Sequence, residues 1–452
     1  MRLVLYTGKG GVGKTTTAAA TAVCAAERGR RTLVVSADAA HSLGDVFERR
    51  LGPDPIQIAP CLDASEVDAR AEMHNHWGRI RDYLVAMFRY QGIEDVVTEE
   101  LAQLPGSEEI TTLLAVEKLA ASGRYDLLIV DCAPTGSALR LATLPEVAHR
   151  ALRLLLPTMQ AITRVGTPVA QKIVSIPLPR SEVFRDAETL IYDKLTTLRE
   201  RITDSQTSVR IVVTPERMVI DEARRAYTEF ALFEIPCDAI VMNRLLPDEV
   251  ANENFFRHWS RLQEERCREV EEVFAPLPVL RAPLLADQVT GCERLAELGQ
   301  HLFAKAEPGD VLSKSARVRF GRDEVGYFAQ VPLPNASGDD LDVVVIDAEL
   351  VITVGARRRF LSLPRRIADC RVLSAKLDAE RLTVHFATPT HRRKDQTAQP
   401  GDDRPAQPGD DRTAQPGDDR TVHPGDDRTA QPGDDRTAHS GDDRTDHPGD
   451  DR

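Results

Sequence analysis

Cysteine is sparse and unpaired in this sequence of 452 residues. Its seven cysteines are scattered, with no C-x-x-C pair and no cluster of histidine and cysteine at the spacing of metal ligands. We therefore expect neither a disulfide framework nor a structural zinc site. This use of cysteine is typical of proteins in the reducing cytoplasm.

Long apolar runs, a signal segment and an excess of basic residues are also missing. No run approaches the ~20 apolar residues of a membrane-spanning helix, so we expect no intrinsic membrane span. Met1–Thr7 leads straight into a glycine-rich loop without the segments of a signal peptide, which again indicates a cytoplasmic protein. The net charge is −13, of which the last 56 residues supply −8. This balance argues against a sequence-independent nucleic-acid binder, because such a protein needs a basic face, but it leaves open a local basic patch.

Residues 1–310 alternate short β-branched runs with helical patterns, as parallel strands joined by crossover helices do. Because the runs are mostly apolar, the strands should be covered on both faces. We predict an α/β domain with a mostly parallel, doubly wound sheet and a helical insertion between the third and fourth runs. The five runs are Leu3–Tyr6, Thr32–Ser36, Asp126–Val130, Val209–Val213 and Ala239–Met242.

Residues 315–388 have a different pattern, since Glu349–Val354 and Arg381–Phe386 alternate wholly or partly with period two. We predict a separate small all-β sandwich, in which the consecutive arginines 357–359 lie on a solvated strand edge. Residues 389–452 form a linker and seven octapeptides related to Thr-Ala-Gln-Pro-Gly-Asp-Asp-Arg. With almost no apolar side chains this tail cannot offset chain entropy, and we expect it to be disordered.

One segment matches the phosphate-binding pattern G-x4-G-K-[ST], between the first strand-like run and a helix predicted to begin near Lys14. Its glycines allow backbone N–H groups to turn toward phosphate oxygens. Lys14 would contact the β- and γ-phosphates, and the Thr15 hydroxyl would bind Mg²⁺. The alternative is a glycine-rich turn without a ligand, but strand, loop, lysine, hydroxyl and helix agree on nucleotide binding. The segment is Gly8-Lys9-Gly10-Gly11-Val12-Gly13-Lys14-Thr15-Thr16.

Two aspartates follow strand-like runs. Asp131 ends the apolar run Leu127–Val130, at the sheet edge where ligands gather in open α/β proteins, so it is a candidate to hold Mg²⁺ directly or through water. Asp38 has the equivalent place after the second run, where a carboxylate can orient the water that attacks the γ-phosphate. An aspartate at a strand end is also common as a helix cap, and spacing alone leaves both interpretations of Asp38 open.

Four segments together resemble the ArsA family, which comprises arsenical-pump-driving ATPases and the related ATPases that target tail-anchored proteins. The resemblance covers about residues 1–305 and implies a P-loop NTPase fold and Mg²⁺-dependent hydrolysis of ATP. It also implies that Asp38 positions the hydrolytic water. The segments are Gly8–Thr16, Asp38–Leu43, Asp131–Gly136 followed by Leu139–Leu141, and Val241–Pro247.

The same resemblance assigns roles to further residues by matching position. His41 and Ser42 would belong to switch I, and Asp131–Thr135 to switch II. Asn243 would hydrogen-bond adenine, and Pro283–Leu285 would lie in the loop that covers the base.

Lys9 is a second lysine inside the glycine-rich loop, which the G-x4-G-K-[ST] geometry does not require. In deviant P-loop ATPases such a lysine reaches across a dimer interface to the partner's nucleotide, and this loop resembles theirs. Since the chain has one P-loop, the resemblance implies a homodimer in which Lys9 acts in trans. A solvated loop lysine is the alternative.

Several departures from the family bear on its clients. Pro105–Glu109 lacks the cysteine of arsenite-responsive members, and the cysteines show no thiolate cluster for a soft metalloid. Six methionines are too few to support a methionine-lined groove for membrane segments. Apolar stripes at Ile80–Phe88 and Leu152–Val165 either line a client groove or face a core.

The β module from Gly326 to Phe386 resembles the α-crystallin or small heat-shock-like sandwich that some bacterial ArsA-like ATPases carry at this end. Client binding and a passive appendage both fit this resemblance. We expect a cytoplasmic, Mg²⁺-dependent ATPase whose homodimer changes shape with ATP to handle a client, with a protein or a membrane protein as the partner class. The alternatives are a non-enzymatic or very slow ATP-switched chaperone or scaffold, and an arsenite pump subunit.

Overall fold

The computed structural model describes residues 1–38, 42–67, 107–132, 194–251, 253–346, 348–378 and 380–387. Several sequence predictions lie outside these residues. They are the two apolar helical stripes, His41 of the switch I motif, residues 133–135 of the switch II motif, and the repeat tail.

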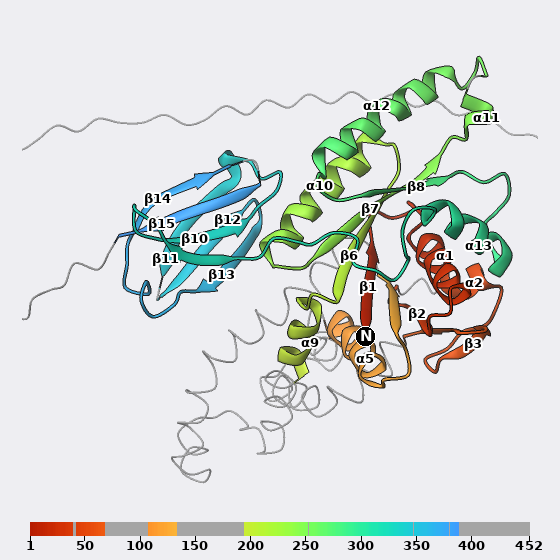
Figure 1. The fold of residues 1–452 in the computed structure, drawn as a ribbon, viewed down its shortest axis with the longest axis horizontal. Coiled ribbons are helices and arrows are strands. Elements are labelled where there is room, and N and C mark those ends of the chain that lie inside the picture. The colour runs from red at the N-terminus through yellow and green to blue at the C-terminus, as the bar shows by residue number, and fades with distance from the viewer. Residues whose placement is uncertain are drawn as a thin grey trace, which may run out of the picture. The chain divides into compact units, whose positions relative to one another are not determined.

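An eight-stranded sheet forms the centre of the N-terminal part (Figure 1). Its strand order is β3-β4-β2-β5-β1-β6-β7-β8, with β3 antiparallel to β4 and every other neighbouring pair parallel. This arrangement confirms the predicted mostly parallel, doubly wound fold. The strands are β1 Arg2–Thr7, β2 Thr32–Ser36, β3 Ile56–Ala59, β4 Leu62–Glu66, β5 Leu127–Asp131, β6 Thr207–Val213, β7 Cys237–Leu245 and β8 Val279–Pro283.

Helices cover both faces of this sheet (Figure 1). On one face lie α1 (Lys14–Glu27), α2 (Ser42–Phe47) and α13 (Gly291–Leu302). Helix α1 packs closely against α13 because Gly299 has no side chain: a Cβ there would lie 2.7 Å from the Ala20 carbonyl oxygen. The other helices are α5 Ser107–Ala121, α9 Leu195–Ile202, α10 Arg217–Leu232, the short α11 Asp248–Ala251 and α12 Arg257–Val273.

The central strands are buried along their whole length, as strands covered on both faces must be. Every residue of β1, β2, β5 and β6 is buried. In β1 the Tyr6 hydroxyl shares a 2.6 Å hydrogen bond with the Thr21 hydroxyl of α1. The strand and the helix that flank the glycine-rich loop are therefore bonded to each other below it.

Seven further strands form two antiparallel sheets, confirming the predicted all-β module. One sheet has the order β14-β15-β10-β9 and the other β11-β12-β13. Buried residues of β10, β12 and β15, including Val331, Ile352 and Val384, form the core of this module, and burial alternates strictly along β15. The strands are β9 Arg319–Arg322, β10 Tyr327–Pro332, β11 Leu341–Ile346, β12 Glu349–Val354, β13 Arg357–Ser362, β14 Val372–Leu377 and β15 Arg381–Phe386, with a 3₁₀ turn η2 at Gly338–Asp340.

The arginines of β13 correct one sequence expectation, because they are not all on a solvated edge. Arg359 is 1% exposed, donates to the Leu232 carbonyl at the end of α10, and pairs with Glu234 at 2.6 Å. Burial raises the pKa of Glu234, but the charge and hydrogen bond of Arg359 and the hydrogen bond from the Val318 amide together outweigh burial and leave this pKa below its usual value. Arg357 pairs with Glu229 of α10 at 3.0 Å, while Arg358 is exposed. Two of the three arginines therefore attach the β module to α10.

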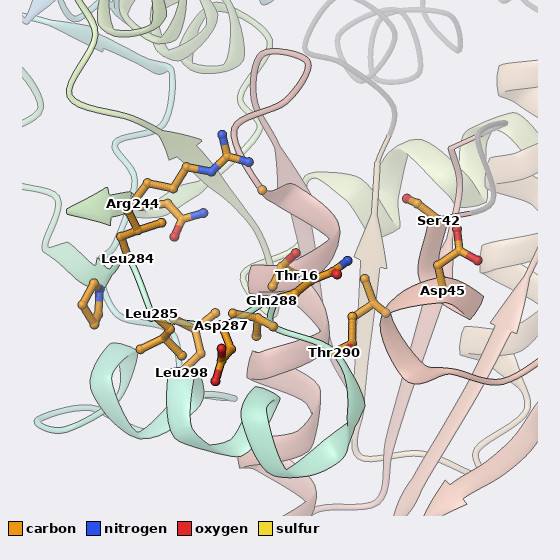
Figure 2. A pocket seen from close by; sticks show the side chains of 15 residues that line it. Thr16, Ser42, Asp45, Arg244, Leu284, Leu285, Asp287, Gln288, Thr290 and Leu298 are labelled. Atoms are coloured by element: carbon orange, nitrogen blue, oxygen red, sulfur yellow. The ribbon is translucent and has the colours of Figure 1, made fainter. Parts of the chain in front are cut away.

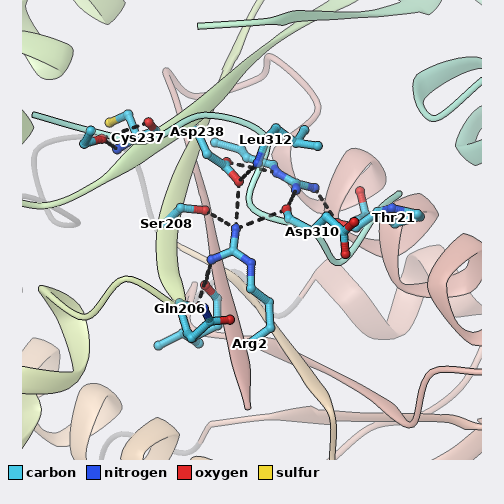
Figure 3. Close-up of polar contacts among 12 residues, drawn as sticks. Arg2, Thr21, Gln206, Ser208, Cys237, Asp238, Asp310 and Leu312 are labelled. Atoms are coloured by element: carbon cyan, nitrogen blue, oxygen red, sulfur yellow. Dashed lines mark hydrogen bonds and ion pairs between the residues drawn. The ribbon is translucent and has the colours of Figure 1, made fainter. Parts of the chain in front are cut away.

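Two buried arginines bind the segment after α13 to strands β1, β6 and β7 (Figure 3). Arg2 of β1 and Arg210 of β6 share the carboxylate of Asp238, at 2.7 Å and 3.2 Å. Arg210 also donates to the Pro308 carbonyl at 2.9 Å, and the Leu312 amide donates to Asp238 at 3.2 Å. These bonds fasten the chain that leads to the β module onto β1, β6 and β7.

Candidate functional site

The glycine-rich loop between β1 and α1 has a backbone that only glycine accommodates at two positions. Gly8 has a φ of +152°, and a Cβ there would lie 2.3 Å from the Val212 carbonyl oxygen of β6. Gly13 has a φ of +91°, and its Cβ would lie 2.3 Å from Nδ2 of Asn243. Both glycines are required by positive φ and by close approach of neighbouring groups. The loop is thereby wedged between β6 and the end of β7.

Lys14 and Thr15 open helix α1, where the predicted helix begins. Lys14 is 7% exposed, and its charge favours the ionised form of the Asp131 carboxyl, which partly opposes the rise of the Asp131 pKa described below. The Thr15 hydroxyl shares a 3.1 Å hydrogen bond with the Ser42 hydroxyl at the start of α2. Thr16 lines the pocket described below. The helix N-terminus thus presents an ammonium and two hydroxyls on the side of the sheet where ligands bind in open α/β folds.

Asp131 is the last residue of β5, in register with Tyr6 of β1 and Ser36 of β2. Its side chain is fully buried, and among the described residues neither carboxylate oxygen accepts a hydrogen bond. Burial raises its pKa to about 7. The Thr15 hydroxyl, which is near the carboxylate but outside hydrogen-bonding geometry, and the Lys14 charge oppose this rise only in part. Buried polar groups without partners are rare in folded proteins and call for an explanation.

A magnesium ion fits these donors. Mg²⁺ prefers hard oxygen ligands and is usually held by one or two protein groups together with phosphate oxygens. Asp131 supplies two carboxylate oxygens without a partner among the described residues, and Thr15 supplies a hydroxyl close enough to affect the Asp131 pKa. A cation at this point would also favour the charged carboxylate that burial disfavours.

Asp38 lies just beyond the end of β2 and is partly exposed. Its negative charge contributes to the raised pKa of Asp131, so the two carboxylates are electrostatic neighbours. Its amide donates to the Ser36 hydroxyl at 3.4 Å. Lys9 is partly exposed and Gly10 and Gly11 are exposed, which places the second lysine on the open side of the glycine-rich loop.

A pocket of about 390 Å³ opens beside the loop (Figure 2). Ligand pockets of this size hold small molecules. One wall consists of Gly13, Thr16 and three residues of α2, and the opposite wall consists of the ends of β7 and β8 and the loop before α13. The lining residues are Gly13, Thr16, Ser42, Asp45, Val46, Asn243, Arg244, Pro283, Leu284, Leu285, Asp287, Gln288, Val289, Thr290 and Leu298.

Asn243 and Pro283 both lie on this pocket. The Asn243 amide donates to the Val12 carbonyl at 2.9 Å, so this side chain also braces the glycine-rich loop. Pro283 ends β8, where it is in register with Leu245 of β7. The structure thus brings these two residues, about 40 positions apart in the chain, to one wall beside the loop. The adenine contact of Asn243 stays a prediction.

Sequence reasoning assigned no contact to two other residues of the pocket, Thr290 and Arg244, although Arg244 lies in the Val241–Pro247 segment. Thr290 precedes α13 and lines the pocket, and its hydroxyl donates to Glu48, one residue beyond α2, at 3.0 Å. Arg244 has a φ of +59°, a conformation that is uncommon outside glycine and asparagine. A helix end and a strand end carry no sequence signal for such contacts, because these depend on how distant segments pack.

Two general features accompany the site. The helices of the described ranges include none that is both long and apolar enough to cross a membrane. All seven cysteines are free, and the described ranges contain no cluster of three or more histidine, cysteine or acidic side chains that would hold a metal ion.

Comparison with known proteins agrees with this geometry. The family model for the anion-transporting ATPase of the ArsA type matches residues 1–304, and the model for an HSP20-like domain found in ArsA matches residues 324–386. A protein of Aquifex aeolicus named "Putative arsenical pump-driving ATPase 1" is 34% identical over 397 residues, covering 86% of this chain and all of that protein.

Two more relatives extend this comparison. Protein Rv2184c of Mycobacterium tuberculosis is 32% identical over 415 residues, covering 85% of this chain and 96% of that protein. An "ATPase ASNA1 homolog" of Trypanosoma cruzi is 27% identical over 334 residues, covering 69% of this chain and 92% of that protein. Since the ATPase model spans more than half of the sequence, the chain belongs to the ArsA family of ATPases and carries an HSP20-like domain after the ATPase region.

Proposed function

We propose that this protein is a cytoplasmic, Mg²⁺-dependent ATPase that hydrolyses ATP to ADP and phosphate in a nucleotide-gated homodimer. The observation that carries the proposal is the Asp131 carboxylate. It is fully buried at the carboxyl end of β5, without a hydrogen bond from the described residues, beside Lys14 and Thr15. A buried carboxylate in this state is suited to a metal that arrives with its nucleotide.

We assign each candidate residue a separate role in ATP binding or hydrolysis. The backbone of Gly8–Thr16 and the Lys14 ammonium would bind the phosphates, and Asn243 and Pro283 would contact the nucleoside. Thr15 and Asp131 would hold Mg²⁺, which would neutralise charge on the phosphates. Asp38 would orient the attacking water, accepting a hydrogen bond from it so that the water is in line with the γ-phosphate.

The position of Lys9 in the glycine-rich loop supports the proposed dimer. The chain has a single glycine-rich loop, and Lys9 is partly exposed beside two exposed glycines. In an associated pair, this ammonium would reach the nucleotide of the partner, so that nucleotide occupancy and subunit contact favour each other.

The β module would take part in client handling. We propose domains at 1–310, 315–388 and 389–452, the last being a linker and disordered repeat tail. The attachment of β13 to α10 by Arg357 and Arg359 supports a module that moves with the ATPase region. The relatives' names point to arsenical pumps in one case and to ASNA1 in the other. Because the cysteines are scattered singly along the chain, we propose a protein or membrane-protein client instead of arsenite.

The experiment that tests the proposal uses Asp38→Asn. This variant keeps size and hydrogen-bonding capacity but loses the carboxylate that orients water. We expect ATP affinity within about 2-fold of wild type and turnover lower by about 10²–10⁴-fold, the usual contribution of a positioned acid–base group. Asp54→Asn, an exposed carboxylate on the chain between α2 and β3, is the matched control.

Steady-state phosphate release and equilibrium ATP binding separate the outcomes. Normal turnover in Asp38→Asn would contradict the assigned role of Asp38. Loss of ATP binding together with a lower melting temperature would favour a helix-capping role instead. Tight ATP binding by the wild-type protein without steady-state turnover would favour the ATP-switched scaffold.

A further inference from the structure

Glu48 and Thr290 join two segments that are far apart in the sequence and lie on opposite walls of the pocket. The Thr290 hydroxyl donates to the Glu48 carboxylate at 3.0 Å. Thr290 lines the pocket, and Figure 2 shows it on the side of the loop that faces the α2 residue Asp45. Glu48 has a φ of +54°, a left-handed conformation that costs a non-glycine residue free energy and is found preferentially at functional sites.

Helix α2 connects this contact with the phosphate end of the site. At its first residue, the Ser42 hydroxyl bonds to the hydroxyl of Thr15, and Glu48 directly follows its last residue. The short helix is firmly held between these points. Leu43 and Phe47 are buried, and the Gly44 amide donates to Glu66 of β4 at 2.9 Å. A six-residue helix fixed in this way can pass a small displacement from one end to the other.

The loop between β8 and α13 has three anchors. The Leu284 amide donates to the Leu245 carbonyl of β7 at 2.7 Å. Asp287 pairs with Arg294 of α13 at 3.0 Å. These two bonds hold the loop to its own wall, whereas the bond from Thr290 to Glu48 crosses to the α2 wall. Leu284, Asp287 and Gln288 are exposed, as expected of a loop that depends on such anchors.

We infer that Glu48 is a positioning residue for nucleotide retention: through α2 it couples the phosphate end of the pocket, at Thr15 and Ser42, to the loop at the nucleoside end. A ligand at the phosphate end displaces the Thr15–Ser42 pair, α2 passes this displacement to Glu48, and Glu48 holds Thr290 and its loop against the bound nucleoside. The inference rests on the proposed function, because it requires a nucleotide in this pocket.

Paired substitutions test the link. Glu48→Ala removes the acceptor, and Thr290→Val removes the donor at nearly constant volume. The Thr290 side chain caps no backbone amide of α13, so Thr290→Val does not remove a helix cap. Thr290→Ser keeps the hydroxyl. Asp54→Asn removes an exposed carboxylate between α2 and β3 that takes no part in these contacts, and it is the control for a general change of surface charge.

The measurement is the dissociation rate of a fluorescent ATP analogue, in the presence of Mg²⁺, chased with unlabelled ATP. We expect dissociation to be about 3- to 10-fold faster in Glu48→Ala and in Thr290→Val, the range that one solvent-exposed hydrogen bond supplies. The double variant should dissociate no faster than the singles, because both remove the same bond. Thr290→Ser should restore slow dissociation, and Asp54→Asn should match wild type.

A second readout separates a specific link from a general distortion. Inorganic tripolyphosphate occupies the phosphate end alone, so its affinity, measured by competition, should be the same in wild type, Glu48→Ala and Thr290→Val. Equal loss of tripolyphosphate and nucleotide affinity would overturn the inference, as would unchanged or additive dissociation rates. If the wild-type protein bound no nucleotide, the proposed function would fail too, whereas wild-type retention in the variants would remove the link alone.

Discussion

The buried carboxylate of Asp131 should destabilise the metal-free protein, so that Asp131→Asn stabilises it at neutral and alkaline pH. The structure buries this side chain completely and gives it no hydrogen bond from the described residues. Its pKa rises from the ordinary 3.8 to about 7. At about 1.36 kcal/mol for each pKa unit, this rise lowers the free energy of unfolding of the protein with ionised Asp131 by about 4 kcal/mol.

The direction of the pH dependence follows from the raised pKa. The folded protein binds the Asp131 proton more tightly than the unfolded chain does. The stability that this proton contributes is therefore complete below about pH 4 and is lost as the pH rises through about 7. The Asp131→Asn variant has no such proton, so its stability relative to wild type should increase by about 4 kcal/mol over the whole titration, of which about 2.6 kcal/mol falls between pH 5 and pH 8.

Urea unfolding in the presence of a chelator, at several pH values between 5 and 8, measures this difference. Asp54→Asn serves as the control, because it removes an exposed carboxylate. With Mg²⁺ and ATP the order should reverse, since a ligand stabilises only the protein that binds it. Identical pH profiles for wild type and Asp131→Asn would refute the account of a buried, unpartnered carboxylate.

The remaining predictions concern the dimer and the β module. Lys9→Ala should lower turnover and abolish ATP-dependent dimerisation while leaving the monomer's melting temperature unchanged. Light scattering in the presence of a non-hydrolysable ATP analogue measures the dimer. A dimer that forms as in wild type would contradict the action of Lys9 on the partner's nucleotide. Arg359→Ala should destabilise the protein by about 1.5–3 kcal/mol, because it removes the hydrogen bond to the partly exposed Glu234 carboxylate. Exposed Arg358→Ala should cost under about 0.5 kcal/mol in the same denaturant titration, and equal losses would rule out the buried pair as the attachment.

The central strands and the glycine-rich loop could be predicted from the sequence because their signals are local. Apolar β-branched runs marked β1, β2, β5, β6 and β7, and the G-x4-G-K-[ST] spacing marked the start of α1. Strands β3, β4 and β8 were missed. Strand β3 has the sequence Ile-Gln-Ile-Ala and is mostly exposed at the sheet edge, so its apolar content is a weak signal.

Long-range contacts could not be predicted, because they depend on how distant segments pack. A row of three arginines in a strand indicates a solvated edge, yet Arg359 is buried because Leu232, the last residue of α10, and Glu234, two residues further on, both contact it. The same holds for Asn243, whose bond to Val12 spans 231 positions, and for Glu48, whose partner Thr290 lies 242 positions away. No local pattern in a single sequence predicts such long-range contacts.

The central claim is that the glycine-rich loop binds a nucleotide triphosphate with Lys14 against its phosphates. Isothermal titration calorimetry of the purified protein with ATP and Mg²⁺, in parallel with Lys14→Ala, tests it most directly. The account predicts saturable binding at one site per chain in the wild-type protein and loss of that binding in the variant. Heat of binding that is absent from the wild type, or equal in both proteins, would contradict it.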